Sequence, residues 1–359
     1  MKFILITICR ILSYVLYVLT LTAAYGGHMN PHLWATPSIF TLALPYLAML
    51  TMLAVVGWAL SRKLISCGLG MAVLVICWAP IMQAVPFGSE KKPSAAPDDR
   101  FTLLTYNILG GFDKNDRNST EGATVRYIIE SDADIVVAQE MGFLNSEGLP
   151  TTPQPMIDSL RQKYPYRLCD GRRIFAILSK FPVRYTAEQI DTGYSDCIYT
   201  LDVRGHRLTV VNTHLSSYRF SDSERGMLSS IHSVGSAKAS ISEFKGSVMS
   251  KMKQAFRERA TESETLRRRL DQLTGPVIVC GDFNDVPASW AYRTIKGDDF
   301  RDAFAETNFG HKATYNANRM PFHIDQILYR GDLKALSVKR VKAGASDHYP
   351  LFATFEFVR

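Results

Sequence analysis

One short segment, 276–287, limits the possible folds of this chain more than any other. It opens with a continuous apolar run, Val277–Cys280, which a glycine separates from Asp282, Phe283 and Asn284. Such a run is typical of a strand that is buried on both faces. Alternation along an extended chain would point Asp282 and Asn284 the same way and turn Phe283 into the packing. Two oxygen-bearing side chains at the rim of a sheet suit a cation and a phosphoryl oxygen, although Asp and Asn also form ordinary turns.

The same arrangement, a buried strand that ends in a polar residue, recurs along the chain. The polar residues at such positions are Asn107, Glu140, His214, Asp282, Asn284, Asp325, Asp347 and His348. Three or more carboxylates near two histidines suit a hard divalent cation and acid–base chemistry on a phosphate ester. A surface charge or a structural histidine is the alternative for any one of these residues, and the repetition argues against it. An aspartate from elsewhere in the chain, such as Asp325, can orient His348 and stabilise its protonated form.

Hydrophobic patterning predicts a domain that mixes strands with helices. Strands are expected at 101–109, 134–140, 173–179, 196–203, 208–215, 277–280, 323–328 and 351–357, and helices at 124–130, 153–163, 251–273 and 289–295. The serine-rich segment Ser216–Ser247 is weakly patterned, and we expect it to be a mobile insertion. Because strands and helices do not alternate strictly, two sheets with helices outside fit better than one parallel sheet.

The N-terminal quarter has a different character, because no Asp or Glu occurs before Glu90. Three apolar stretches, Phe3–Ala24, Ile39–Leu60 and Ile65–Phe87, are each near the ~20 residues that a helix needs to cross a bilayer. Helices that are apolar on all sides argue against a buried helical core. We therefore predict a membrane anchor over residues 1–88 with three transmembrane helices. The small residues that end the first stretch also suit a cleaved signal peptide.

The charges between these stretches predict an orientation. The first connection, 25–38, has no Lys or Arg, whereas Lys2, Arg10, Arg62 and Lys63 lie at the other ends of the stretches. The positive-inside rule places these four cations in the cytoplasm. An integral membrane protein with three spans then has a cytoplasmic N-terminus and a catalytic domain outside the cytoplasm.

The remaining composition divides the chain further. Residues 89–100 are rich in Pro, Ser, Ala and charge and are predicted to be a linker to a domain at 101–359. The net charge of +7 includes the four anchor cations, so the rest of the chain carries only 37 Lys and Arg against 34 Asp and Glu. This near balance is weak evidence for nucleic-acid binding. The six cysteines show no spacing of a zinc site.

Six short motifs, taken in order, resemble those of a known superfamily. They are Thr105–Ile108, Gln139–Glu140, Asn212–Leu215, Gly281–Asn284, Ile324–Asp325 and Ser346–Pro350. They are similar to the motifs of the endonuclease/exonuclease/phosphatase superfamily, which includes deoxyribonuclease, apurinic endonuclease and sphingomyelinase-like enzymes. The resemblance covers residues 101–359. It implies a four-layer α/β sandwich, two packed mixed sheets flanked by helices, and phosphoester hydrolysis that depends on Mg²⁺, with Mn²⁺ as the alternative ion.

The resemblance also implies a metal site. Glu140 matches the main metal ligand of the superfamily, with Asn107 and Asp347 nearby. One motif departs from the family, which often has Arg-Ile-Asp-Tyr where this chain has His323-Ile324-Asp325-Gln326. The aspartate is retained, so the chemistry is expected to survive while the neighbouring contacts differ.

The catalytic roles implied by the resemblance fall on five residues. His348 matches the residue that activates water or contacts the scissile phosphate, with Asp325 as its orienting partner. Asp282 and Asn284 match the groups that position the nucleophile and bind the transition state. His214 matches the histidine that binds the phosphate or the leaving group.

These observations predict a membrane-anchored phosphodiesterase or phosphatase that acts outside the cytoplasm and has a monomeric catalytic domain. Its partners would be the lipid bilayer and a phosphoester substrate, either nucleic acid or a phospholipid or other small phosphoester. One alternative is an extracytoplasmic nuclease that scavenges nucleic acid. Another is a non-catalytic phosphate-binding scaffold that has kept the fold. Fold and motifs do not choose among the substrates.

Overall fold

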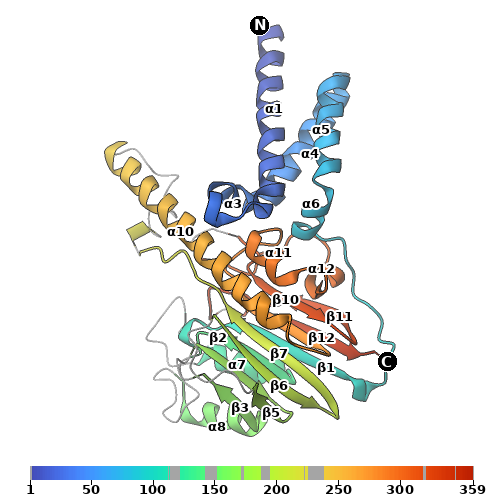
Figure 1. Ribbon diagram of the computed structural model, residues 1–359, viewed down its shortest axis with the longest axis vertical. Helices are drawn as coiled ribbons and strands as arrows, with labels where there is room; N and C mark the ends of the chain where they lie inside the picture. The colour runs from blue at the N-terminus through green and yellow to red at the C-terminus, as the bar shows by residue number, and fades with distance from the viewer. Residues whose placement is uncertain are drawn as a thin grey trace.

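The structure is a computed structural model of the 359-residue chain. It describes residues 2–111, 113, 122–141, 152–170, 174–186, 195–221, 223–224, 238–317, 321–343 and 345–358. Much of the predicted insertion Ser216–Ser247, at 222 and 225–237, lies outside the described residues. Helices from the N-terminal quarter of the chain project from one side of a domain built on two sheets (Figure 1).

In the described parts of the chain the domain has two six-stranded sheets. The first has the order β11 (Leu333–Arg340), β12 (Leu351–Phe357), β1 (Arg100–Asn107), β2 (Ile135–Gln139), β4 (Phe175–Ser179) and β3 (Tyr166–Cys169). The second has the order β5 (Val183–Tyr185), β6 (Asp196–Val203), β7 (His206–His214), β8 (Val277–Asp282), β10 (Asp325–Arg330) and β9 (Arg301–Asp302). Strand β1 is parallel to β2, and β7 is parallel to β8. The other neighbours are antiparallel, so both sheets are mixed.

The two sheets pack face to face with helices outside them. The core between the sheets contains apolar side chains of both, among them Leu103, Val137, Ile177, Tyr199, Val210 and Cys280. Helices α7 (Ala123–Ser131) and α8 (Gln154–Lys163) cover the outer face of the first sheet. Helices α10 (Lys238–Leu270) and α11 (Trp290–Lys296) cover the second, and α12 (Ala303–Thr307) packs near β10 and β11. The predicted pair of packed mixed sheets flanked by helices is therefore confirmed.

Several elements differ from the sequence-based expectation. Strands β3, β5, β9 and β11 were not expected, because they are short or lie toward the edges of the sheets, where one face stays polar. Helix α10 begins at Lys238 rather than at Lys251, so the last part of the expected insertion is helical. Its first turns are rich in serine, and their apolar residues at helical spacing, Ile241, Phe244 and Val248, were not recognised as the start of the helix.

The N-terminal unit comprises α1 (Lys2–Tyr25), η1 (Gly26–His28), α2 (Pro31–Trp34), α3 (Thr36–Thr41), α4 (Leu44–Leu60), α5 (Leu64–Ile76) and α6 (Trp78–Ala84). Among the described residues, one stretch, Phe3–His28, is helical, long and apolar enough to cross a membrane. Helix α4 has only 17 residues. Helices α5 and α6 are bent by 65° at Cys77, so α5 and α6 make a second span only if the bent pair is taken as a single helix. The prediction of three transmembrane helices is not supported, because breaks in the helices interrupt two of the three apolar runs.

Hydrogen bonds join the long helices of the N-terminal unit. The hydroxyls of Thr20 and Thr51 lie 2.8 Å apart, and the Tyr17 hydroxyl donates to the Ser66 carbonyl at 3.0 Å. Leucines and methionines on the other faces of the helices are exposed, for example Leu12, Met52, Leu53 and Ile65. A helical unit with polar contacts inside and apolar side chains outside is typical of a protein surrounded by lipid.

The chain between the helices and the domain is paired along the domain surface. The Gly88 N–H donates to the Asn308 carbonyl at 2.8 Å, and the Gly310 N–H donates to the Pro86 carbonyl at 2.7 Å. Further on, the N–H groups of Ser94 and Ala95 donate to Glu356, beyond which η2 (Pro97–Asp99) leads into β1. Much of the predicted linker 89–100 is therefore fixed to the domain.

Candidate active site

Sheet topology brings the predicted site residues to one place. The parallel pair β1–β2 and the parallel pair β7–β8 present their carboxyl ends to the same edge of the packed sheets. Strand β10 runs against β8, so its first residue, Asp325, lies opposite the last residue of β8, Asp282. Strand β12 runs against β1, so the segment before it, which carries His348, also reaches this edge. Residues far apart in the sequence therefore meet at one edge of the sheets, because each of them lies at or near the end of a strand.

Asn107, at the end of β1, connects two carboxylates. Its Nδ2 donates to Glu140 Oε1 at 2.9 Å and to Asp282 Oδ2 at 3.1 Å. Its side-chain oxygen accepts the Leu109 N–H at 3.1 Å. Glu140 follows β2 with a left-handed backbone, φ 56°, which is uncommon for a residue other than glycine. Asn107 therefore holds Glu140 in a fixed relation to Asp282 across the gap between the sheets.

His214 lies at the end of β7 beside the same two carboxylates. Its Nε2 lies 3.7 Å from Glu140 Oε1 and 3.6 Å from Asp282 Oδ2. These distances exceed those of ordinary hydrogen bonds and leave the imidazole edge facing the site. His214 is thus placed to donate to an oxygen that enters between it and the carboxylates.

Asp282 is buried at the end of β8 and is held by its neighbour Asn284. Asp282 Oδ1 accepts the Asn284 N–H at 2.8 Å, and Oδ2 accepts Asn284 Nδ2 at 3.2 Å. The side chain of Phe283 is fully buried under α11, as expected. Before them, Gly281 has φ 138°, and a Cβ there would lie 2.0 Å from the Thr213 carbonyl oxygen. The close approach of β7 to β8 at the site therefore requires glycine.

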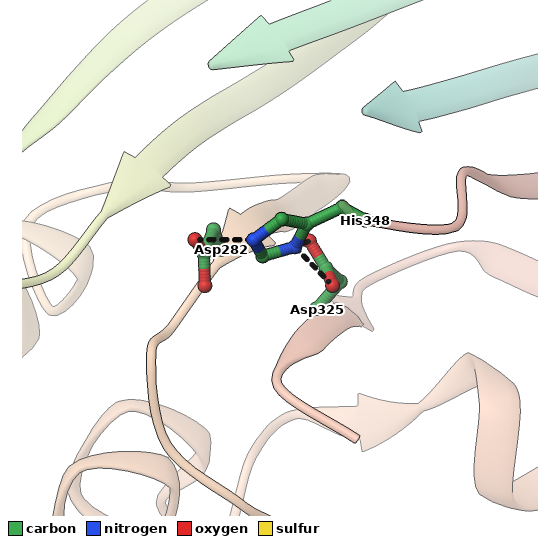
Figure 2. A group of neighbouring side chains, drawn as sticks. All are labelled: Asp282, Asp325 and His348. Atoms are coloured by element: carbon green, nitrogen blue, oxygen red, sulfur yellow. Dashed lines mark hydrogen bonds and ion pairs between the residues drawn. The ribbon is translucent and has the colours of Figure 1, made fainter. Parts of the chain in front are cut away.

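His348 and Asp325 form the shortest charged pair of the site (Figure 2). His348 Nδ1 lies 2.9 Å and 3.1 Å from the two oxygens of Asp325, and His348 Nε2 lies 3.6 Å from Asp282 Oδ2. Burial disfavours the charged imidazole, but the carboxylates of Asp325 and Asp282 outweigh it and raise the pKa of His348 to about 10. Burial, helped by Asp325, raises the pKa of Asp282 against the attraction of the histidines. The site thus holds a cationic imidazole between two acids.

These residues line one pocket of about 250 Å³. Its polar lining includes Glu140, His214, Asp282, Asn284, Asp347 and His348. Asp325 supports it from behind His348, and Asn107 supports it from behind Glu140. The eight residues predicted from the sequence are therefore in or directly beside a single pocket.

The donor atoms in this pocket fit a hard divalent cation. The ligand atoms of Asp282, Asp325 and His348 lie within 4.8 Å of one another, but Asp325 is engaged by His348, and a protonated imidazole has no free lone pair for a metal. Glu140 and Asp347 remain as carboxylates that face the pocket, and the Glu140 side chain is 37% exposed. Oxygen ligands of this kind are those that Mg²⁺ takes in proteins. The acidic side of the pocket therefore fits a cation better than the buried triad does.

The pocket also contains residues that the sequence-based prediction missed. Its apolar lining includes Leu42, Tyr218, Phe220, Tyr315, Phe322 and Ile324. Leu42 belongs to the N-terminal unit, and nothing in its local sequence separates it from the other leucines of an apolar stretch. Beneath the pocket, Gln139 Nε2 donates to Asn212 Oδ1 at 2.7 Å and joins the two sheets. The sequence signal for this pair of residues was an amide side chain within an otherwise apolar strand.

Two family models match the chain. The model of the Endonuclease/Exonuclease/phosphatase family matches residues 104–348, which is more than half of the chain and contains the whole predicted site. A second model, described as a domain of unknown function, matches residues 3–84. No curated protein sequence matches the chain.

Solved structures of similar proteins each cover 72% of this chain. They include humanized TDP2 of D. rerio with 14 mutations, at 16% identity, 99% coverage of that chain and a TM-score of 0.46. They also include the catalytic domain of human Nocturnin, at 17% identity, 95% coverage and a TM-score of 0.47. A third is an endonuclease/exonuclease/phosphatase from Bacteroides vulgatus, at 19% identity, 99% coverage and a TM-score of 0.45.

The family model includes all strands of both sheets except β12 and the start of β1, and it includes all eight predicted site residues. The chain belongs to the endonuclease/exonuclease/phosphatase family and is a hydrolase of phosphoester bonds.

Proposed function

We propose that this protein is a membrane-attached phosphoester hydrolase that uses a divalent cation, Mg²⁺ in the first place, and acts outside the cytoplasm. One observation carries the catalytic part of the proposal. His348, supported by Asp325, and the buried Asp282 face one pocket together with the carboxylates of Glu140 and Asp347. Hydrolysis of a phosphoester needs a proton acceptor for water and groups that neutralise charge on the phosphoryl oxygens, and this pocket contains both.

The geometry favours separate roles for the two buried groups. A carboxylate with a raised pKa accepts a proton more readily than an ordinary one, so Asp282 takes the proton of the attacking water. His348 is charged at neutral pH and donates from Nε2 to a phosphoryl oxygen. Of the two roles that the resemblance left open for His348, contact with the scissile phosphate is therefore the better one. Asn284 keeps the Asp282 carboxylate aimed at the water.

A divalent cation held by Glu140 and Asp347 would neutralise the charge of the phosphoryl oxygens. Asn107 fixes Glu140 for this purpose through its amide hydrogen bond. His214, beside the same carboxylate, donates to the phosphate or to the leaving oxygen. The site then has positive groups on two sides of the scissile bond and a proton acceptor on the third.

The test uses the full chain in detergent micelles with para-nitrophenyl phosphate, methyl para-nitrophenyl phosphate and a duplex oligonucleotide. We expect turnover of at least one substrate that EDTA removes and Mg²⁺ restores. Glu140→Gln should raise the Mg²⁺ concentration for half-maximal activity by at least ~10-fold. Glu130→Gln, at an exposed position on α7, is the matched control. A folded protein with no turnover of any phosphoester would support the non-catalytic scaffold instead.

The membrane part of the proposal rests on α1. The stretch Phe3–His28 is long and apolar enough to span a bilayer, and α4 and α5 form a hairpin that returns the chain to the side from which it left. The side of the membrane on which the domain lies then depends only on the orientation of α1. The N-terminal end of α1 and the connection between α4 and α5 lie far from the domain (Figure 1). These ends carry Lys2, Arg62 and Lys63, which favours a cytoplasmic location for them.

Exposed aromatic side chains near the base of these helices support the same placement. Trp34 is 58% exposed and Phe87 is 65% exposed, and Phe87 contacts Phe309 of the catalytic domain, itself 67% exposed. Aromatic residues concentrate where a bilayer meets water. The test is the accessibility of a cysteine introduced at Arg359 to a membrane-impermeant maleimide in intact cells, in a chain whose native cysteines are replaced. Labelling only after lysis would contradict the proposed side.

A further inference from the structure

The N-terminal unit touches the loop that carries the catalytic residues. A Cβ at Gly27, in η1, would lie 1.8 Å from the carbonyl oxygen of Ala288, so the two backbones are in direct contact. Ala288 is fully buried and belongs to the same apolar cluster as Tyr17 and Leu44 of the helical unit. It follows Asn284 by four residues in the loop after β8. The helical unit is therefore packed against the catalytic loop.

A second contact places the helical unit in the pocket itself. Leu42, on the connection between α3 and α4, lines the pocket and is 8% exposed. It belongs to an apolar cluster with Phe256 of α10 and with Ile324, which directly precedes Asp325. One residue of the pocket lining thus comes from outside the catalytic domain.

The pocket lining combines polar catalytic residues with an apolar cluster. In the lining the cluster consists of Leu42, Tyr218, Tyr315, Phe322 and Ile324, with Phe220 stacked on Tyr218 and with Ser217 and Arg219 beside them in the chain. The apolar cluster begins next to the chemistry, because the ring of Tyr315 lies 5.1 Å from the ring of His348. A phosphate group alone gains nothing from an apolar wall, whereas a hydrocarbon chain gains free energy in proportion to the area that it buries.

The apolar wall also leads toward the membrane. Leu42 is two residues from Leu44, the first residue of α4, and the outer face of α4 exposes Met49, Met52 and Leu53. A molecule with its phosphate among the polar residues would have its hydrocarbon chain next to the base of a helix that faces lipid. The chain therefore passes from the pocket wall at Leu42 to the exposed apolar face of α4 within about two helical turns.

We infer that the substrate is a phospholipid of the bilayer, with the scissile phosphate among the polar residues of the pocket and the first part of its hydrocarbon chain against Leu42. This inference rests on the proposed function and narrows its substrate class. The N-terminal unit then has two tasks, attachment to the bilayer and recognition of the chain of the lipid.

The test compares substrates that differ only in chain length. The full protein, in mixed micelles of fixed composition, is given methyl and hexadecyl para-nitrophenyl phosphate as diesters, and methyl and hexadecyl phosphate as monoesters. We expect kcat/KM for the hexadecyl ester to exceed that for the methyl ester by at least ~10-fold in whichever pair is hydrolysed. Equal rates within that pair would overturn the inference and leave the proposed hydrolase intact.

Two further outcomes separate the inference from the proposed function. Hydrolysis of a duplex oligonucleotide but of neither ester pair would also overturn the inference alone. No hydrolysis of any phosphoester would contradict the proposed function, and the inference with it.

Variants separate recognition in the pocket from simple partition of the longer ester into micelles. Leu42→Ala should lower the hexadecyl-to-methyl ratio of kcat/KM by at least ~5-fold, since it removes the contact without changing partition. Leu53→Ala makes the same change on an exposed face of α4 and should keep the ratio. A ratio unchanged in Leu42→Ala would contradict the role of this wall.

A second pair tests the docking of the helical unit. Gly27→Ala forces the two backbones apart and should lower the same ratio, whereas Gly57→Ala, where a Cβ meets nothing within 4 Å, should not. Equal ratios in both glycine variants, with Gly27→Ala correctly folded by circular dichroism, would contradict the docking.

Discussion

Arg259 and Asp285 form an ion pair inside the domain, with Arg259 Nε 3.2 Å from Asp285 Oδ2 and both side chains almost completely buried. The same guanidinium donates from Nη1 to the Ser216 carbonyl at 2.9 Å and lies against the rings of Tyr218 and Phe256. Ser216 follows the His214 strand, and Asp285 follows Asn284. One side chain of α10 therefore joins the two loops that carry the site.

Replacing Arg259 with Met should lower the free energy of unfolding by about 3–5 kcal/mol, because Asp285 would remain buried without its partner. Burial already raises the pKa of Asp285, even with Arg259 beside it. The measurement is denaturant unfolding of the full chain in detergent. Arg257→Met, on the exposed side of the same helix, is the control, and a loss no larger than that of the control would refute the assignment.

Asp325→Asn should lower kcat by about 10²–10⁴-fold, because an amide cannot stabilise the His348 imidazolium. The wild-type pKa of His348, about 10, means that the charged form is present below pH 10 and is lost as the pH rises through it. In the variant the pKa falls, so the alkaline loss of activity should move to lower pH. The measurement is the pH–rate profile. Asp332→Asn, exposed in the turn before β11, should follow the wild-type profile.

Because of His323, we expect the free energy of unfolding to decrease in acid. Its Nδ1 donates to the Lys312 carbonyl at 2.7 Å, and burial lowers its pKa to about 4 from the ordinary 6.5. Because the folded-state pKa lies below the unfolded one, this stability is complete above pH 6.5 and is lost as the pH falls toward 4, by roughly 3 kcal/mol.

His323→Asn keeps a donor for the Lys312 carbonyl and removes the titration. The drop in unfolding free energy between pH 7 and pH 4.5 should therefore be smaller in this variant than in the wild type. His32→Asn changes an exposed histidine and should leave the drop as it is. The same drop in all three proteins would show that His323 does not titrate as described.

Glu356 should decide whether the segment 89–100 is held to the domain. Its buried carboxylate accepts the N–H groups of Ser94 and Ala95 at 2.9 and 3.0 Å, and the Lys334 ammonium lies 2.9 Å away. Glu356→Ala removes these acceptors and the carboxylate partner of Lys334. Limited proteolysis should then cut within 89–100 several times faster than in wild type. Glu130→Ala is the control, and equal cleavage rates would mean that other contacts hold the segment.

Local sequence was sufficient for the strands of the site. The apolar run Val277–Cys280 forms the buried strand β8, and Phe283 turns into the core as alternation predicts. Asp282 and Asn284 were expected to point the same way along an extended chain, and the structure brings them into contact by a different route. Asn284 has φ 50°, so a turn brings the two side chains together, and an extended chain does not. The types of residue in the sequence predicted which side chains form the site. The backbone conformation that brings Asp282 and Asn284 together was known only from the structure.

Edge strands and tertiary contacts could not be predicted in the same way. Strand β11 contains Lys334, Lys339 and Arg340, which interrupt an apolar pattern because one of its faces is open to water. Composition identified the N-terminal unit, but the bend at Cys77 was not predicted. The sequence carries a signal for it, because Pro80 has no N–H to donate and its ring would clash with the carbonyl of Ile76, where α5 ends. The place of Leu42 in the pocket has no local signal at all, since it results from the packing of the N-terminal unit against the catalytic domain.

The N-terminal unit contacts the catalytic domain at several separated places, among them where Gly27 meets Ala288, where Leu42 packs in a cluster with Ile324 and where Gly88 pairs with Asn308. Separated attachments prevent the domain from swinging about a single tether. For an enzyme on a bilayer, the pocket then stays at a constant height above the lipid surface. If the substrate is a lipid of that bilayer, as we infer, it arrives by lateral diffusion in two dimensions, so the rate of the enzyme would follow the surface density of that lipid and not its amount in the surrounding volume.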